Sequence, residues 1–457
     1  MRIDLRKIKN HKNDLFLNKI YDYIIIGSGP AAITLYKKLI FKSKIKKNIL
    51  IIEEGDFYKH KYKKVFSKNL KIKLKSRSFS VGGTTNIWSN VSSYFEDFEM
   101  KQRWDKNTNN LWPIKQNVLL KQYKKLNKEY KFFFNKLKKK KLNIPFEIRP
   151  FVASVKPLNF RSLINFKEID LLYNCKIESI DETQNFVKAY SRNNKFKLNA
   201  KKIIICCGGI ESVNLILNSL SQKKLKNIKN KKYVGKFFMD HPKFSLGYLK
   251  YPKTEIIKKL ELKKSRNLVY FQGVSLRKEL QFKNKLLNSY VRFEKSNSKI
   301  VKFLEILNIP ILKKYLEKKS IFRVRLFCEM IPDVNNSIEL KKGKTHINLK
   351  LNKIDYKTIE LLSNNIKFFF SKKPDQEDKF NLKNINNRIE DASHHMGGLR
   401  FDQKNNSSIV DENLKINGLK NIYVCSSALF PTSGSVNPTM TICALSNRLG
   451  EYLNKKI

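Results

Sequence analysis

The N-terminal region carries the pattern that most restricts the possible fold: an apolar strand, a glycine-rich turn, a helix and a second apolar strand. Residues 22–26 form a short apolar run, residues 31–43 place apolar side chains at helical spacing, and residues 48–55 contain a second run rich in isoleucine. Such β-branched runs are typical of strands buried on both faces of a parallel sheet. The chain therefore begins with a βαβ unit, which predicts an α/β domain.

The turn after the first strand has the chemistry of a dinucleotide site. It fits the pattern G-x-G-x-x-A, in which the first glycine permits a tight turn and the second lets the backbone approach a pyrophosphate. The N–H groups at the start of the helix attract the phosphates. The residues predicted to contact the cofactor are Gly27, Gly29, Pro30, Ala31 and Ala32.

An acidic residue stands at the end of the second strand. Glu53 is placed to accept hydrogen bonds from ribose hydroxyls, whereas the neighbouring Glu54 has a less suitable register in the strand. The G-x-G-x-x-A turn and the acidic Glu53 together predict a bound dinucleotide, but they do not distinguish FAD from NAD.

The chain is strongly basic. It has 94 lysines and arginines against 39 acidic residues, a formal net charge of +55. Attraction to nucleic acid or to an anionic membrane is one interpretation. Compositional drift is the other, because the excess is almost all lysine and accompanies abundant Asn, Ile and Phe, which share A/T-rich codons. Drift is favoured, since dedicated phosphate sites tend to use arginine, and no specific nucleic-acid partner is predicted.

Several absences in the sequence bear on location. No run approaches 18 apolar residues, and the basic N-terminus lacks the apolar stretch of a secretory signal. The six cysteines form no C-x-x-C pair, which favours buried thiols in a reducing compartment, and no Cys/His cluster has metal spacing. We predict a cytoplasmic protein without a metal. Residues 129–146 set aromatics beside lysines, which suits either a peripheral membrane contact or an ordinary solvated helix.

Four later segments have residues suited to a cofactor or a substrate. Residues 78–90 read SFSVGGTTNIWSN, residues 201–219 read KKIIICCGGIESVNLILNS, and residues 393–398 read SHHMGG. An Asn-Pro step at 437–438 then opens a helix-like run. Together with the N-terminal fingerprint, these segments resemble the glucose–methanol–choline (GMC) family of flavin oxidoreductases.

The resemblance is specific over residues 21–90, 200–245 and 390–457. It implies a Rossmann-like FAD-binding domain interleaved with a mainly antiparallel substrate domain, an α/β fold that is α+β overall. At 457 residues and 41% hydrophobic composition, the chain is large enough for these domains. The division that follows is a basic lead-in at 1–20, an FAD-binding domain at 21–95, 168–222 and 393–457, and a substrate domain with insertions at 96–167 and 223–392.

The resemblance also assigns cofactor contacts. It places Gly82, Gly83 and Thr84 in a loop beside the flavin and diphosphate, where glycine lets the backbone come close. Ser426 stands where many relatives carry an acidic residue or glycine, and its hydroxyl can still donate a hydrogen bond to the flavin. Some relatives bond the flavin covalently through a histidine, and Ile87 occupies that position here. The FAD is therefore expected to be non-covalent. Pro438 and Thr439 complete the predicted contacts at the start of the last helix.

The catalytic prediction follows from the chemistry of alcohol oxidation. A base must take the hydroxyl proton while the carbon-bound hydrogen leaves as hydride to flavin N5, and histidine has a pKa suited to the base. By resemblance, His394 is the base and Asn437 hydrogen-bonds the substrate oxygen. The alternatives are that the histidine is structural and that Asn437 only caps the helix. His395, on the neighbouring spacer, and the Asp240-His241-Pro242 element are expected to be structural.

The sequence thus predicts an FAD-dependent dehydrogenase or oxidase that acts on the CH–OH group of a small alcohol or sugar. Oxygen, a quinone and a protein all remain open as the electron acceptor. One alternative is a flavin-fold protein without turnover that binds an anionic surface or polymer through its lysines. The other is an unrelated FAD or NAD oxidoreductase that shares only the nucleotide fold.

Overall fold

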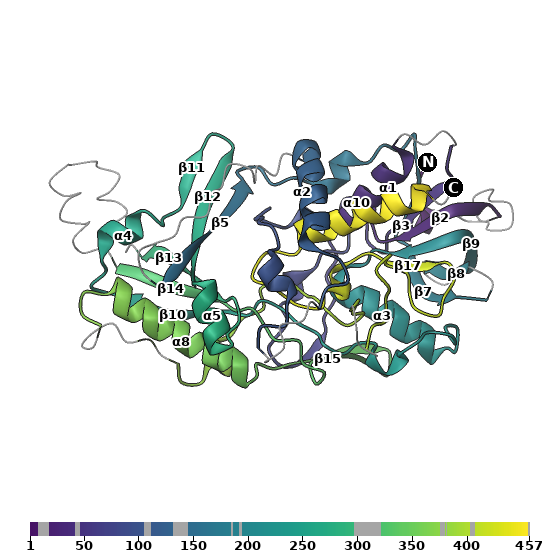
Figure 1. Cartoon of the computed structure of the whole chain (residues 1–457). Coiled ribbons are helices and arrows are strands. Elements are labelled where there is room, and N and C mark those ends of the chain that lie inside the picture. The colour runs from purple at the N-terminus through teal and green to yellow at the C-terminus, as the bar shows by residue number, and fades with distance from the viewer. Residues whose placement is uncertain are drawn as a thin grey trace.

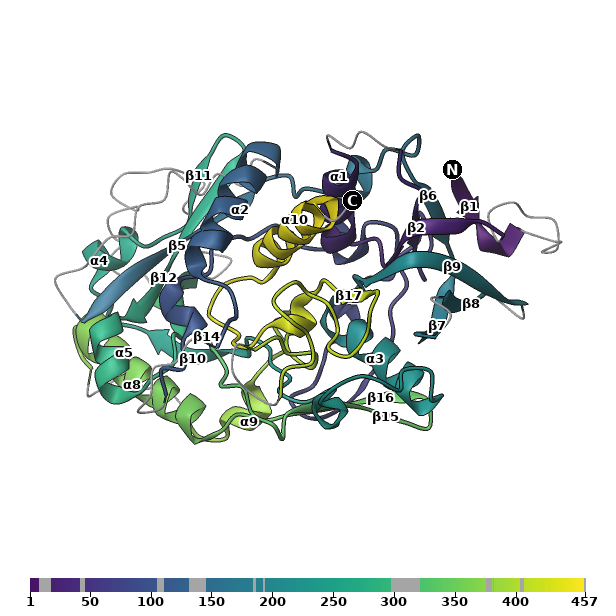
Figure 2. The same cartoon turned by 45° about the vertical axis from the view of Figure 1, so that its right-hand side comes forward.

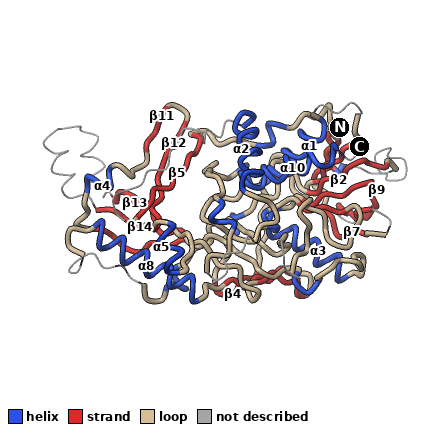
Figure 3. The backbone as a smooth tube through the Cα atoms, viewed as in Figure 1, coloured by secondary structure: helices blue, strands red, loops and turns tan. Residues whose placement is uncertain are grey.

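The protein is described from a computed structural model, and Figure 1 shows its course from the N-terminus to the C-terminus. The residues that the structure describes are 1–7, 18–41, 46–104, 111–130, 145–183, 186–191, 194–296, 321–374, 380, 382–402 and 407–455. Two large sheets lie at opposite ends of the molecule, and long loops fill the region between them (Figure 3).

The larger sheet has eight strands and contains the predicted βαβ unit. Its order is β1-β6-β3-β2-β9-β8-β7, and β17 pairs with the second half of β9. The strands are β1 (Arg2–Asp4), β2 (Ile20–Ile26), β3 (Ile49–Ile52), β6 (Asp170–Tyr173), β7 (Lys176–Asp181), β8 (Phe186–Ser191), β9 (Asn194–Ile205) and β17 (Ile422–Val424). From β1 to β9 all neighbours run parallel, whereas β7 and β8 join antiparallel.

Helices cover both faces of this sheet, as a doubly wound α/β fold requires. On one side α1 (Pro30–Ile40) packs against α10 (Thr439–Lys455), which in turn contacts α2 (Gln116–Tyr130). On the other side α3 (Gly208–Ser221) packs on β7 (Figure 1). The last helix of the chain therefore lies beside the first, which brings the C-terminal region to the predicted cofactor turn.

The second sheet is antiparallel at every pairing, in the order β10-β14-β13-β12-β11, with β5 added to β12. Its strands are β5 (Phe146–Ser154), β10 (Lys243–Leu249), β11 (Lys263–Ser265), β12 (Leu268–Leu276), β13 (Tyr290–Ser296) and β14 (Ile321–Phe327). The helices α5 (Lys278–Asn284) and α8 (Lys353–Phe370) lie along this sheet, and α4 (Thr254–Lys258) lies at its edge (Figure 2). The predicted fold class, a Rossmann-like domain with a mainly antiparallel second sheet, is confirmed.

A three-stranded sheet and a long loop region connect the two larger sheets. The small sheet joins β15 (Ser337–Lys341), β16 (Lys344–Leu349) and β4 (Phe66–Asn69), and α9 (Ile385–Arg388) follows α8 along the chain. Near the centre, the segment before β10 pairs with the segment around the histidine motif through the Met239–Met396 and Lys243–Glu390 bridges. This pairing joins two regions that are about 150 residues apart in sequence.

Two of the sequence predictions need comment. Residues 1–20 are predicted to be a lead-in, yet Arg2–Asp4 forms strand β1, which pairs with β6 at the edge of the large sheet. The proposed membrane-contact stretch, 129–146, lies largely outside the described residues, because 131–144 are not described. Within the described ranges, no helix is both long enough and apolar enough to cross a bilayer. The domain boundaries themselves remain a prediction.

Candidate active site

A large cavity opens where the parallel strands end. The carboxyl ends of β2, β3 and β9 meet at one edge of the sheet, which is where open α/β sheets bind ligands. The cavity has a volume of about 780 Å³, enough for a ligand of cofactor size. The predicted cofactor residues that line it are Gly27, Gly29, Pro30, Ala31, Glu53, Gly83, Thr84, Ser426, Pro438 and Thr439. Ala32 is buried beneath them, and the Gly82 N–H donates to Ser28 Oγ at 3.1 Å.

The glycines of the cavity wall are required by close backbone contacts. A Cβ on Gly27 would lie 2.5 Å from the Cys206 carbonyl oxygen, and one on Gly83 would lie 2.9 Å from the Gly29 Cα. Gly27 and Gly83 also have φ values of +98° and +62°, which side chains rarely adopt. Two backbone segments therefore form this wall without intervening side chains, as a pyrophosphate-binding turn needs.

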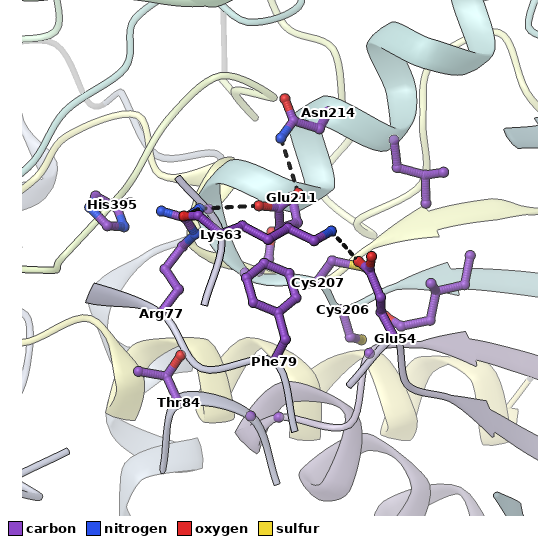
Figure 4. Close-up of a pocket in the computed structure, with 18 of the residues that line it drawn as sticks. Glu54, Lys63, Arg77, Phe79, Thr84, Cys206, Cys207, Glu211, Asn214 and His395 are labelled. Atoms are coloured by element: carbon purple, nitrogen blue, oxygen red, sulfur yellow. Dashed lines mark hydrogen bonds and ion pairs between the residues drawn. The ribbon is translucent and has the colours of Figure 1, made fainter. Parts of the chain in front are cut away.

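The predicted ribose acid, Glu53, is fully enclosed at the cavity wall. Its carboxylate accepts hydrogen bonds from Ser28 N at 3.2 Å, Ser28 Oγ at 2.7 Å and Gly55 N at 2.8 Å. Burial nevertheless raises the pKa of Glu53 to about 7, against the opposing effect of the Ser28 hydrogen bonds. Glu54 also lines the cavity and pairs with Lys63 (Figure 4).

Cationic groups at the cavity suit an anionic cofactor. Arg77 lines the cavity and lies 3.4 Å from Glu211, yet its Nε and Nη1 are buried with no hydrogen-bond partner among the described residues (Figure 4). Buried N–H groups without partners are costly, and a pyrophosphate would satisfy them. The residues present therefore fit FAD. Sequence reasoning missed Arg77, although its place five residues before Gly82 in a basic loop was an available signal.

The two predicted catalytic residues lie in contact. Asn437 Nδ2 is 2.9 Å from His394 Nε2, and Asn437 lies two residues before the start of α10. The helix begins at Thr439, with the Pro438 carbonyl accepting its first hydrogen bond from Ile442. The Asn437 amide thus meets the imidazole, and a capping role alone does not describe it. Both residues stay partly exposed, while their neighbours Ser393, His395, Pro438 and Thr439 line the cavity.

The protein holds His394 in its neutral form. Burial, and then the neighbouring His241 and Lys243, keep the pKa of His394 well below its usual value. A neutral imidazole has one nitrogen free to accept a proton, so the environment favours a base. Ser393, just before it, adopts a left-handed φ of +65°, and its N–H donates to Asp391.

His395 has a different environment. It is buried, lines the cavity, and places Nε2 3.2 Å from Asp391 Oδ1. Asp240 lies next to Asp391, and burial followed by the Asp391 charge raises the pKa of Asp240 to about 7. Ser427 Oγ donates to the His395 carbonyl, and Ser426 accepts from Ala428 N at 3.3 Å. These contacts hold the loop beneath the cavity.

Comparisons with known proteins agree with this architecture. Residues 349–446, which include both His394 and Asn437, match the family model described as GMC oxidoreductase. The predicted family resemblance is confirmed. No curated protein sequence matches the chain.

Among solved structures, two oxidases align over nearly the whole chain. Pyridoxine 4-oxidase from Mesorbium loti aligns with a TM-score of 0.58 at 12% identity, covering 94% of this chain and 99% of that one. Two variants of Aspergillus oryzae formate oxidase, studied for FAD modification, align with TM-scores of 0.58 and 0.57 at 14% and 13% identity. Each covers 96% of this chain and 98% of its own. At these identities the structures show a shared fold, and the family model matches the C-terminal stretch that contains His394 and Asn437.

Proposed function

We propose that this GMC-type chain is an FAD-dependent oxidoreductase that oxidises the CH–OH group of a small alcohol or sugar. The observation that carries the proposal is the contact between His394 Nε2 and Asn437 Nδ2 beside the cavity. A hydroxyl that enters between them can give its proton to the imidazole and accept a hydrogen bond from the amide. Bound FAD would supply the acceptor for the hydride that leaves the substrate carbon.

The chain's own groups divide the cofactor site into parts. Gly27, Gly29 and Gly83 offer backbone to the diphosphate, Arg77 offers cationic N–H groups, and Glu53 offers a carboxylate to the ribose. Ser426, Pro438 and Thr439 line the cavity near the proposed base. Ile87 stands where a covalent histidine would be, so we propose that FAD is held non-covalently and is released by acid precipitation of the holoprotein.

The first test is the His394→Ala variant. Removing a positioned base should lower kcat by about 10² or more, since general bases contribute roughly 10² to 10⁴ in rate. The measurement is anaerobic bleaching of the flavin band by a panel of alcohols and sugars, followed by turnover with an artificial acceptor. His346→Ala, on β16, is the matched control and should keep full activity.

The outcomes separate the alternatives. A variant that retains its flavin but turns over within a few-fold of the native rate would favour an unrelated oxidoreductase. A native protein that binds FAD without reacting, yet binds acidic liposomes in a salt-sensitive way, would favour a surface-binding protein. The electron acceptor, the cytoplasmic location and any peripheral membrane contact remain predictions.

A further inference from the structure

His241, outside the predicted catalytic pair, contacts the proposed base. Its ring is 3% exposed, and its Nδ1 lies 3.0 Å from His394 Nδ1, with the two rings nearly perpendicular at 82°. Its other nitrogen, Nε2, lies 3.0 Å from the Ser433 carbonyl oxygen and 2.8 Å from the Gly434 carbonyl oxygen. The second histidine therefore joins the base to the loop that leads to Asn437.

The partners of His241 determine which of its nitrogens carries hydrogen. Carbonyl oxygens only accept hydrogen bonds, so Nε2, which faces two of them, must be the N–H group. Burial lowers the pKa of His241 to about 4, and the ring is neutral at pH 7. A neutral imidazole has a single N–H, so Nδ1 of His241 carries the lone pair.

The same reasoning extends to His394. Its Nδ1 faces the His241 lone pair, so this nitrogen must donate. Its Nε2 then carries the lone pair, and this atom is the one that meets the donating Asn437 amide at 2.9 Å. The opposite arrangement would set a lone pair of His241 against two carbonyl oxygens. Three partners outside the two rings, the carbonyl oxygens of Ser433 and Gly434 and the Asn437 amide, thus agree on one tautomer for each ring.

The residue before His241 holds the backbone of the base. Asp240 Oδ1 accepts from the His394 N–H and Oδ2 from the Ala392 N–H, both at 2.8 Å. The Met239–Met396 pair of backbone hydrogen bonds aligns the two segments. Main chain and ring of His394 are therefore both fixed by the segment 239–241.

We propose that His241 is a positioning residue that sets the tautomer of His394, so that Nε2 faces the substrate as the proton acceptor. The catalytic meaning rests on the proposed function, whereas the tautomer does not. When the substrate hydroxyl gives its proton to Nε2, His394 becomes a cation with two N–H groups. Its Nδ1–H still donates to His241, which stays neutral and stabilises the new charge.

The tautomers can be tested without turnover. In protein labelled with ¹⁵N-histidine, long-range ¹H–¹⁵N spectra at pH 7 should show His394 as the Nδ1–H form and His241 as the Nε2–H form. The His394→Ala and His241→Asn variants assign the signals among the six histidines. A native spectrum with His394 as the Nε2–H form overturns the proposal, whether or not the protein oxidises alcohols.

Turnover variants test the consequence. His241→Leu removes the acceptor and should lower kcat about 100-fold with KM nearly unchanged, as is typical when a residue that fixes a reactive imidazole is lost. His241→Asn can present an oxygen to His394 Nδ1 and should recover most of that loss. His346→Leu is the matched control.

Each outcome of the His241 and His394 variants leads to a different conclusion. Equal losses in the Leu and Asn variants, with FAD content and melting temperature at native values, would overturn the positioning role. If His241→Leu fails to fold, His241→Asn and the native spectrum still decide it. A His394→Ala variant with native turnover would instead overturn the proposed function and leave the tautomer result standing.

Discussion

At the scale of single residues, the site contains ionisable groups that the protein largely shields from water. Burial shifts the pKa values of Glu53 and His394, and Arg77 keeps two buried N–H groups without a hydrogen-bond partner among the described residues. Such groups reduce the stability of the protein without its ligand, and a ligand or substrate can meet their requirements. This is the pattern expected of binding and reacting groups.

Glu53 gives a prediction about stability and pH. Its pKa is raised from 4.5 to about 7, so between these values the folded protein binds more protons than the unfolded chain. The free energy of unfolding then falls as pH rises, by roughly 3 kcal/mol from below pH 4.5 to above pH 7. Glu53→Gln should remove this fall in FAD-free protein, measured by urea unfolding at pH 5 and pH 8.

The same variant should bind FAD more weakly, because the amide is a poorer acceptor for ribose hydroxyls. Glu54→Gln, which breaks the ion pair with Lys63 at the neighbouring position, is the control and should keep most of the pH dependence, because burial raises the pKa of Glu53 more than the Glu54 charge does. If the free energy of unfolding of Glu53→Gln falls between pH 5 and pH 8 as much as that of the native protein, the buried carboxylate is not the cause of the fall.

At the scale of elements, turns that join strands to helices shape the cavity. The β2–α1 turn contacts the 3₁₀ helix at Gly83–Asn86. At Gly29 and Gly83 no side chain separates the two backbones. The α10 N-terminus faces the same space from the opposite end of the chain. Close packing of loops on a helix start leaves little tolerance for added atoms.

Gly83→Ala tests this close approach. The new methyl group would meet the Gly29 Cα at 2.9 Å and hold a φ of +62°, so we expect FAD content to fall below one-tenth of native. Gly343→Ala, in the β15–β16 turn where the three-stranded sheet lines the same cavity, has a similar φ of +71° but no atom within 4 Å of the added carbon. It should cost about 1 kcal/mol in stability and retain FAD. Equal FAD loss in both variants would indicate that backbone strain at positive φ, and not the contact between Gly83 and Gly29, causes the loss.

At the scale of the whole molecule, the proposed active site is assembled from three distant stretches. Residues 239–241, 393–396 and 433–437 meet between the two large sheets, through backbone bridges and the hydrogen bonds of His241. The cavity itself joins the large sheet to the three-stranded sheet, since Lys344 and Thr345 also line it. A bound cofactor would thus contact both parts.

Adding FAD to the FAD-free protein tests whether the folded chain binds this cofactor. FAD should raise the melting temperature of FAD-free protein in a concentration-dependent way, because a ligand that binds only the folded state adds about 2.7 kcal/mol at 100 times Kd. NAD at the same concentrations should have no effect. A shift with NAD and none with FAD would favour a nicotinamide enzyme, and differential scanning fluorimetry distinguishes the two directly.

Much of this arrangement was predictable because it is local in sequence. The β2 strand, the Gly27–Ala32 turn and α1 follow from periodicity and glycine spacing within about 20 residues. Glu53 follows from its place after β3. The contact between His394 and Asn437 was predicted only through family resemblance, since 43 residues separate the two and no local pattern links them.

The sequence by itself determined the βαβ unit, the cofactor turn and the residue types suited to acid–base chemistry, because strand and helix periods and glycine conformations act over short distances. Only the tertiary structure decided the partner of His394 and the unmet hydrogen bonds of Arg77. His241 is 153 residues from His394, and its role appears only when two carbonyl oxygens, two rings and an amide meet in one place. Hydrogen-bond direction depends on the complete set of partners, and packing between distant segments supplies that set.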